Sequence, residues 1–119
     1  LSLDCLTLAE LPAAEMIRVA AGAGYASVSI WVQAPILPGG VLTSPEMAND
    51  IARAMRETGV TIGNLEVFNL NTDSPISDFE PALALGAGLG AQTATCIDYG
   101  SSRADIAERL GQFHELSVR

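Results

Sequence analysis

Three short joints, each centred on a glycine, divide the 119-residue sequence into four similar units. The joints are Ala23-Gly24-Tyr25, Thr58-Gly59-Val60 and Leu89-Gly90-Ala91. Each follows a segment with helical spacing of apolar residues and precedes a segment with strand character, and glycine readily ends a helix in the left-handed conformation. The joints lie roughly thirty residues apart, which is the length of one strand-and-helix unit. The repeat therefore predicts an α/β protein made of four βα units.

The pattern of apolar residues places one strand and one helix in each unit. The expected strands are 1–6, 26–32, 60–68 and 92–98, and the expected helices are 11–23, 45–58, 78–85 or beyond, and 103–118. The second helix has the clearest start, because Ser44-Pro45-Glu46 combines a capping side chain, a proline in the first turn and an early carboxylate. Gly59 is expected to end this helix.

The first three expected strands each have one apolar and one polar face. In the third strand Leu65 and Val67 alternate with Asn64, Glu66 and Phe68. The polar residues of the other two strands are Ser2, Asp4, Ser29 and Trp31. The central strands of a doubly wound open sheet have helices on both faces and are apolar on both. The polar faces therefore favour a (β/α) barrel of the TIM type, with helices outside and polar side chains inside.

Four units are too few to close an eight-stranded barrel. Residues 1–119 are therefore expected to form the N-terminal half of a (β/α)8 barrel, from its first strand to its fourth helix, with no second domain. The half would belong to a longer chain or would pair with another half. The strand-to-helix loops 33–43 and 69–77 are long and the opposite joints are short, which places function at the carboxyl ends of the strands.

Polar and aromatic residues near these strand ends are the candidate site residues. In a barrel Asp4 and Glu66 would point inward, and Asp98 would lie at the mouth of the fourth strand. Clustered carboxylates raise one another's pKa unless a cation or hydrogen-bond donors compensate. Trp31 would offer a flat apolar wall to a small organic ligand. Asn69 would donate hydrogen bonds to ligand hydroxyls, although bonding within its own turn is an alternative.

Composition excludes several classes of function. The net charge is −8 and all six basic residues are Arg, so no basic stripe is available to bind a nucleic-acid backbone. The absence of Lys excludes a Schiff-base lysine and a P-loop lysine. Cys5 and Cys96 match no metal spacing and are expected to be buried thiols within strands. No signal peptide or long apolar run is visible, so a cytoplasmic protein without a membrane partner is expected.

Several segments together resemble one known family along the whole chain. They are Leu1-Ser-Leu-Asp-Cys-Leu-Thr-Leu, Ala21-Gly-Ala-Gly-Tyr-Ala-Ser-Val-Ser-Ile-Trp, Glu57-Thr-Gly-Val, Leu65-Glu-Val-Phe and Leu89-Gly-Ala. This sequence resembles the first four βα units of the sugar phosphate isomerase/epimerase family, the xylose isomerase-like TIM barrels. The resemblance implies a divalent metal (Mn, Mg, Zn or Co) held by Glu, Asp, His and Glu of later strands, which are not in this chain. What it carries over to this chain is the pocket wall at Trp31, Glu66 and Asp98.

The resemblance implies proton transfer next to the carbonyl of a small polyhydroxylated substrate, a sugar or keto acid, with a divalent metal polarising the oxygen. This chain would position the substrate and by itself would be inactive. Two alternatives remain open. One is a non-catalytic interaction module in which the half-barrel pairs with the missing C-terminal half or with another copy. The other is an AP endonuclease-like nuclease of the same fold, which the charge of −8 disfavours.

Overall fold

The structure is a computed structural model that describes residues 1–33, 42–71 and 73–118. Most of the expected loop 33–43 therefore lies outside the described residues. The strands are β1 (Ser2–Leu3), β2 (Ser27–Trp31), β3 (Thr61–Asn69) and β4 (Thr93–Ile97). The helices are α1 (Ala13–Gly22), α2 (Pro45–Thr58), α3 (Glu80–Gly88) and α4 (Arg103–Ser117), with short 3-10 helices η1 (Cys5–Leu8) and η2 (Ile76–Phe79).

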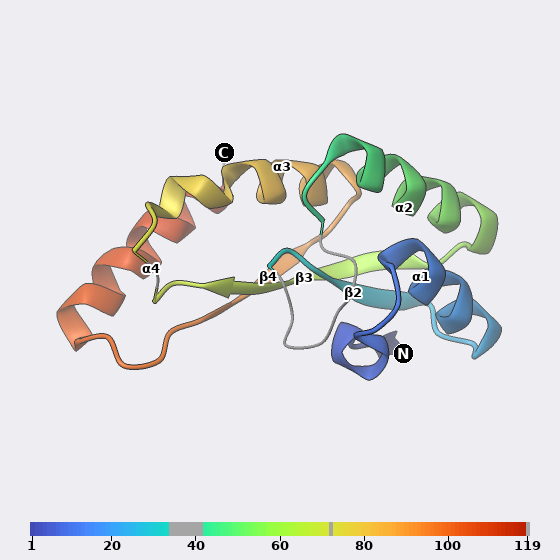
Figure 1. Cartoon of the computed structure of the whole chain (residues 1–119), viewed down its shortest axis with the longest axis horizontal. Coiled ribbons are helices and arrows are strands. Elements are labelled where there is room, and N and C mark those ends of the chain that lie inside the picture. The colour runs from blue at the N-terminus through green and yellow to red at the C-terminus, as the bar shows by residue number, and fades with distance from the viewer. Residues whose placement is uncertain (34–41, 72, 119) are drawn as a thin grey trace.

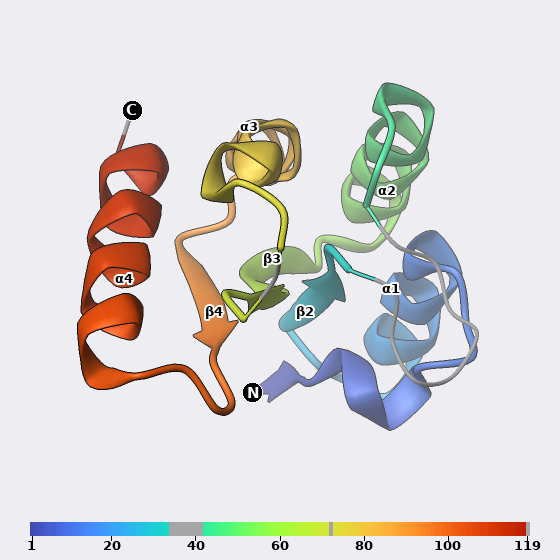
Figure 2. The ribbon, with the colours of Figure 1, turned by 60° about the vertical axis from the view of Figure 1, so that its left-hand side comes forward.

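The four strands form one parallel sheet in the order β1-β2-β3-β4 (Figure 1). The strand order follows the chain without reversal, whereas a doubly wound sheet reverses direction at a switch point. The four α-helices form an arc around one side of the sheet, from α1 through α2 and α3 to α4 (Figure 2). The prediction of an α/β fold with helices between parallel strands is therefore confirmed. None of the helices described here is both long and apolar enough to cross a membrane.

The hydrophobic core lies between the sheet and the helices. Ile17 of α1, Ile30 of β2, Ile51 of α2 and Ile62 of β3 are almost completely buried there. At the other end of the core, three phenylalanine rings pack edge to face or tilted against one another. These rings, hereafter the phenylalanine cluster, belong to Phe68 of β3, Phe79 of η2 and Phe113 of α4.

The predicted ends of the second helix agree with the structure, whereas α1 begins at Ala13 and not at residue 11, and α3 begins at Glu80 and not at residue 78. The Ser44 hydroxyl accepts a hydrogen bond from the Met47 backbone N–H at 3.3 Å, and Pro45 is the first residue of α2. Backbone and Ser44 hydrogen bonds at the helix start lower the pKa of Glu46. Gly59 ends α2 with φ of +76°, and the joint glycines Gly24 and Gly90 also have positive φ. Glycine is favoured at each joint because other residues rarely adopt this conformation.

The expected first strand, residues 1–6, is wrong beyond Leu3. Asp4 is the N-cap of η1, because its Oδ1 accepts a hydrogen bond from the Leu6 backbone N–H at 2.8 Å. A second bond, from the Thr7 N–H to the Asp4 carbonyl, closes the turn. Cys5 therefore lies in a 3-10 helix and not in a strand, while Cys96 lies in β4 as expected. Aspartate often ends a strand in this way, because its short side chain accepts hydrogen bonds from nearby backbone N–H groups that would otherwise pair with a neighbouring strand.

Two irregularities in β3 change the expected alternation. Val28 pairs with Ile62 and Ser29 with Asn64, so Gly63 is an extra residue that no β2 residue pairs with. A Cβ at Gly63 would lie 2.7 Å from the Ser27 Oγ, so the Ser27 hydroxyl would have to rotate away to accommodate it. Further on, Leu65 pairs with Ala94 and Phe68 with Cys96. Phe68 consequently packs in the phenylalanine cluster, and the prediction that it shares a face with Glu66 is wrong.

Candidate functional site

The sheet face opposite the core carries a polar group of side chains. Val28 and Ile30 of β2 are fully buried in the core, so the alternating residue Ser29 lies on the other face. Asn64 and Glu66 of β3 pair in register with Ser29 and Trp31 and share that face. Asp4 and Cys5 follow directly after β1 and lie near this face of the sheet. The Cys5 backbone N–H donates a hydrogen bond to the Ser29 Oγ at 2.9 Å.

Glu66 is the most unusual residue of this face. Its side chain is nine-tenths buried, with 9% of the residue exposed. The Asn64 Nδ2 donates to Glu66 Oε1 at 2.8 Å, and the Cys5 Sγ lies 3.9 Å from Oε2. Within the described ranges no Arg or His forms an ion pair with it. Burying a carboxylate without an opposite charge is costly. The burial of Glu66 therefore indicates that a charge or a ligand from outside the described residues compensates its negative charge.

Asp4, Cys5 and Glu66 converge, and we call them the carboxylate–thiol cluster. One ligand atom of each lies within 4.8 Å of the others. Burial raises the pKa of the Cys5 thiol to about 12; the Ser29 hydrogen bond opposes the shift, while the charges of Glu66 and Asp4 add to it. The thiol is therefore protonated at neutral pH, where it can donate to Glu66. The Asp4 side chain is exposed at the rim of this cluster.

Trp31 lies next to Glu66, since the two residues pair in register between β2 and β3. Only 9% of Trp31 is exposed. Its Nε1 is buried and has no hydrogen-bond partner in the part of the chain that the structure describes. Buried indole N–H groups usually find an acceptor, so this donor is available to an oxygen atom from outside the described chain.

Asp98 and Asn69 lie at the carboxyl ends of β4 and β3 and do not join the cluster. Asp98 Oδ1 accepts from the Ser101 N–H at 3.2 Å, while its buried Oδ2 has no partner among the described residues. The Asn69 side chain accepts from the Asn71 N–H at 3.0 Å, so it bonds within its own turn. Asn71 in turn donates through Nδ2 to the Tyr99 carbonyl, which ties together the loops after β3 and β4.

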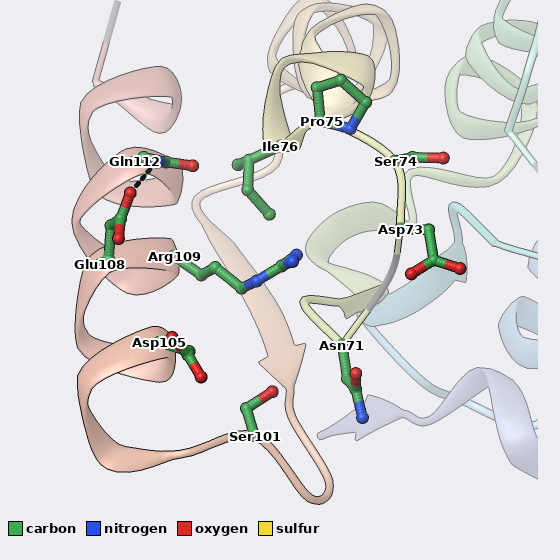
Figure 3. A pocket seen from close by; sticks show the side chains of 10 residues that line it. All are labelled: Asn71, Asp73, Ser74, Pro75, Ile76, Ser101, Asp105, Glu108, Arg109 and Gln112. Carbon is green, nitrogen blue, oxygen red and sulfur yellow. Dashed lines mark hydrogen bonds between the residues drawn. The ribbon is translucent and has the colours of Figure 1, made fainter.

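A cavity of about 510 Å³ lies beside these loops, between the segment after β3 and helix α4 (Figure 3). Arg109 extends from α4 toward that segment and donates to the Leu70 carbonyl at 2.7 Å. The acidic residues of its lining are Asp73, Asp105 and Glu108. The predicted location of function at the strand ends includes the loop that contains Asn71. It does not include the α4 residues, because the sequence does not show which loop the exposed face of a helix lies beside.

The sequence reasoning also missed Cys5, Ser29 and Asn64 as site residues. Ser29 and Asn64 each precede a predicted site residue by two positions, so strand alternation placed them on the correct face. Their roles were not visible because Ser29 accepts from the Cys5 backbone N–H of η1, and Asn64 donates to Glu66 two residues along the same strand; strand alternation predicts neither bond. Cys5 was assigned to a strand, and only the turn at Asp4 brings its thiol to Glu66.

Comparison with known proteins identifies a fold relative but no family. No protein-family model matches the chain, and no curated protein matches it. The chain is similar to the crystal structure of protein SMc04130 from Sinorhizobium meliloti 1021, with a TM-score of 0.66 and 16% sequence identity. The match covers 99% of this chain and 46% of that one, so the chain spans less than half the length of the solved protein. At this identity the likeness concerns the fold alone.

Proposed function

We propose that residues 1–119 form the N-terminal half of a (β/α)8 barrel of the xylose isomerase-like type. The sequential parallel order of the strands and the arc of helices on one side support this architecture. The structural match supports it further, because four βα units here correspond to 46% of the other chain. The completing half would come from a longer chain, a separate chain or another copy.

The proposed activity of the whole barrel is proton transfer next to the carbonyl of a small sugar or keto acid. The observation that carries this proposal is the buried Glu66 carboxylate, which faces away from the core and has no cation among the described residues. In a closed barrel such a group would accept hydrogen bonds from substrate hydroxyls, and the neighbouring Trp31 would donate from Nε1. The function of these residues would be to orient the substrate.

The resemblance implies a divalent metal (Mn, Mg, Zn or Co) with ligands on later strands. No described residue of this chain takes the place of its Glu, Asp, His and Glu. When bound in the complete barrel, this metal would polarise the substrate carbonyl. The role proposed for this chain is limited to positioning the substrate and excluding water around Glu66 and Trp31.

Deuterium exchange tests the proposed activity. The full-length protein that contains this chain is incubated in D2O with Mn²⁺ and neutral ketoses or keto acids, and NMR follows label entering at the carbon next to the carbonyl. Glu66→Gln is expected to lower kcat/KM by about 10- to 100-fold, since a hydrogen bond to a charged group is lost. Glu57→Gln is the control, because Glu57 forms an exposed ion pair with Arg18 at 2.8 Å.

Absence of label with every substrate, or full activity in Glu66→Gln, would contradict the proposed activity. Stability supplies a second measurement on the same variant. In metal-free buffer, where Glu66 is buried without a cation, Glu66→Gln is expected to unfold at the same or a higher urea concentration than the parent. A large loss of stability would mean that the carboxylate serves mainly to hold the fold.

An interaction module is the second candidate. It is favoured by the strand order, in which β1 and β4 each pair with only one described neighbour. Free strand edges are surfaces on which a further chain can pair. Sedimentation of the chain, alone and mixed with the completing half, combined with the exchange assay distinguishes the candidates, since an interaction module would associate without showing any exchange activity.

A further inference from the structure

We propose that Asp4, Cys5 and Glu66 form a binding site for one divalent cation of the zinc or cobalt class. This site differs from the metal that the family resemblance implies, because its three ligands come from β3 and from the turn after β1. It requires neither the further strands of the proposed barrel nor the proposed catalytic activity. The cation would lie on the polar face of the sheet, between the rim carboxylate of Asp4 and the buried pair of Cys5 and Glu66.

The distances within the cluster suit a tetrahedral ion. In a zinc site the bonds to sulfur and to carboxylate oxygen are about 2.3 and 2.1 Å, which places the two ligand atoms about 3.6 Å apart. The Cys5 Sγ and Glu66 Oε2 are 3.9 Å apart, and the Asp4 oxygen lies within 4.8 Å of both. Small side-chain rotations would therefore complete the arrangement, since Asp4 is exposed and can offer a carboxylate oxygen to the cation while Oδ1 caps η1.

The buried charge of Glu66 is a separate reason to expect a cation. Asn64 satisfies only Oε1, and the contact of Oε2 with the Cys5 sulfur is long. A bound cation would neutralise the charge of the carboxylate, and the metal–ligand bond would offset the free-energy cost of its burial. Exposed acidic clusters provide no such reason, because water already solvates their charges.

A second observation concerns Trp31, the β2 residue that pairs in register with Glu66. Its buried Nε1–H lacks an acceptor in the described chain, and register places Trp31 beside Glu66 on the same face. Three protein ligands leave the fourth position of a tetrahedral ion open. A water molecule or a ligand oxygen bound there would offer this N–H an acceptor.

The chemistry of the donor atoms decides the class of ion. Magnesium, manganese and calcium favour sites made wholly of oxygen, whereas a thiolate favours zinc and its spectroscopic substitute cobalt. The sulfur of Cys5 therefore argues for the zinc class. Binding would transfer the thiol proton to solvent as the thiolate–metal bond forms, with no change in oxidation state.

Cobalt titration of the purified full-length protein tests the proposal. One equivalent of Co²⁺ is expected to produce a thiolate-to-cobalt charge-transfer band in the near ultraviolet, together with the visible bands of a tetrahedral ion, and Zn²⁺ should displace both. Cys5→Ser should remove the charge-transfer band. Cys96→Ser is the matched control and should retain it, because Cys96 lies in β4 outside the cluster.

Two further variants keep the test decisive if Cys5→Ser fails to fold. Asp4→Asn preserves an N-capping side chain while removing its charge, and should weaken cobalt binding about tenfold or more with the charge-transfer band retained at saturation. Glu66→Gln should weaken binding at least as much. Absence of the band in the parent protein, its persistence in Cys5→Ser, or its loss in Cys96→Ser would overturn the proposal. None of these outcomes depends on the isomerase-type activity.

Discussion

Strands β2 and β4 have the same length and both pair in parallel, yet they differ sharply in burial. Four of the five residues of β2 are buried, whereas none of the five residues of β4 is buried. The helices follow the same trend, because α1 has four buried residues and α4 has only Phe113. The cause is the number of neighbours: β2 lies between β1 and β3, but β4 pairs with β3 alone in the described sheet.

The difference shows where the stability of this chain resides. The units around β2 and β3 have a continuous core of aliphatic side chains, while the β4–α4 unit depends on the phenylalanine cluster and on the Arg109 bond to Leu70. We therefore expect β4 and α4 to unfold at lower free energy than β2 and α1. The following substitutions test that difference.

The largest effect is expected from Phe68→Ala. Its ring lies 5.2 Å from that of Phe79 and 5.0 Å from that of Phe113, so the substitution empties the centre of the cluster. A loss of about 3–5 kcal/mol in the free energy of unfolding is expected in urea titrations. Leu110→Ala on α4 is the control; Leu110 is 42% exposed, and a change within about 0.5 kcal/mol is expected. Equal losses in both variants would contradict the role of the cluster.

A pair of isoleucines compares the two strands directly. Ile30 of β2 is fully buried, while Ile97 of β4 is partly exposed. Ile30→Ala is expected to lower the free energy of unfolding by about 2–4 kcal/mol, and Ile97→Ala by about half of that or less. Thermal and urea unfolding of both variants measure the contrast. A greater loss for Ile97 would show that the β4 unit is packed more tightly than its burial indicates.

Two glycines of α3 give a smaller effect with opposite signs. A Cβ at Gly86 would lie 2.7 Å from Leu65 Cδ2, whereas a Cβ at Gly88 would meet nothing within 4 Å. Gly86→Ala is therefore expected to destabilise by about 1–3 kcal/mol through overpacking against β3. Gly88→Ala should be neutral or stabilise by up to about 1 kcal/mol through helix propensity. The difference between their melting temperatures is the measurement, and equal values would contradict the close helix–strand contact.

The smallest effect concerns the start of α2. The pKa of Glu46 is lowered by hydrogen bonds at the helix N-terminus, so its charged form favours the folded state. This stability is present above the unfolded pKa of about 4.5 and is lost as the pH falls through the folded pKa. Glu46→Gln should therefore melt slightly below the parent at pH 7 and together with it in strong acid. A constant difference across the pH range would contradict this origin.

Local signals in the sequence predicted much of the fold correctly. Ser44, Pro45 and Gly59 set the ends of α2 through bonds within a few residues, and such effects depend little on the rest of the molecule. The polar face with Glu66 was predicted from strand alternation and agrees with the register. The barrel itself and its chemistry remain a proposal, because closure depends on strands beyond these four.

The errors have a common physical origin in the backbone. Asp4 bonds to the Leu6 N–H and ends β1 after two residues, so the expected six-residue strand is not formed. In β3 the register shift before Phe68 turns that side chain into the core. The prediction that alternate residues lie on opposite faces assumes uninterrupted pairing between strands. It fails wherever a side-chain hydrogen bond or an extra residue interrupts that pairing.

Gly63 has a consequence for how the length of this chain can change. Since no β2 residue pairs with Gly63, its deletion would leave Ile62, Asn64, Leu65 and Glu66 alternating without interruption along β2. A deletion at this point would keep every flanking side chain on its present face, whereas one at Leu65 would exchange the two faces. Homologues can therefore lose a codon here while the orientation of Glu66 is preserved, so alignments of related sequences should permit a gap at this glycine.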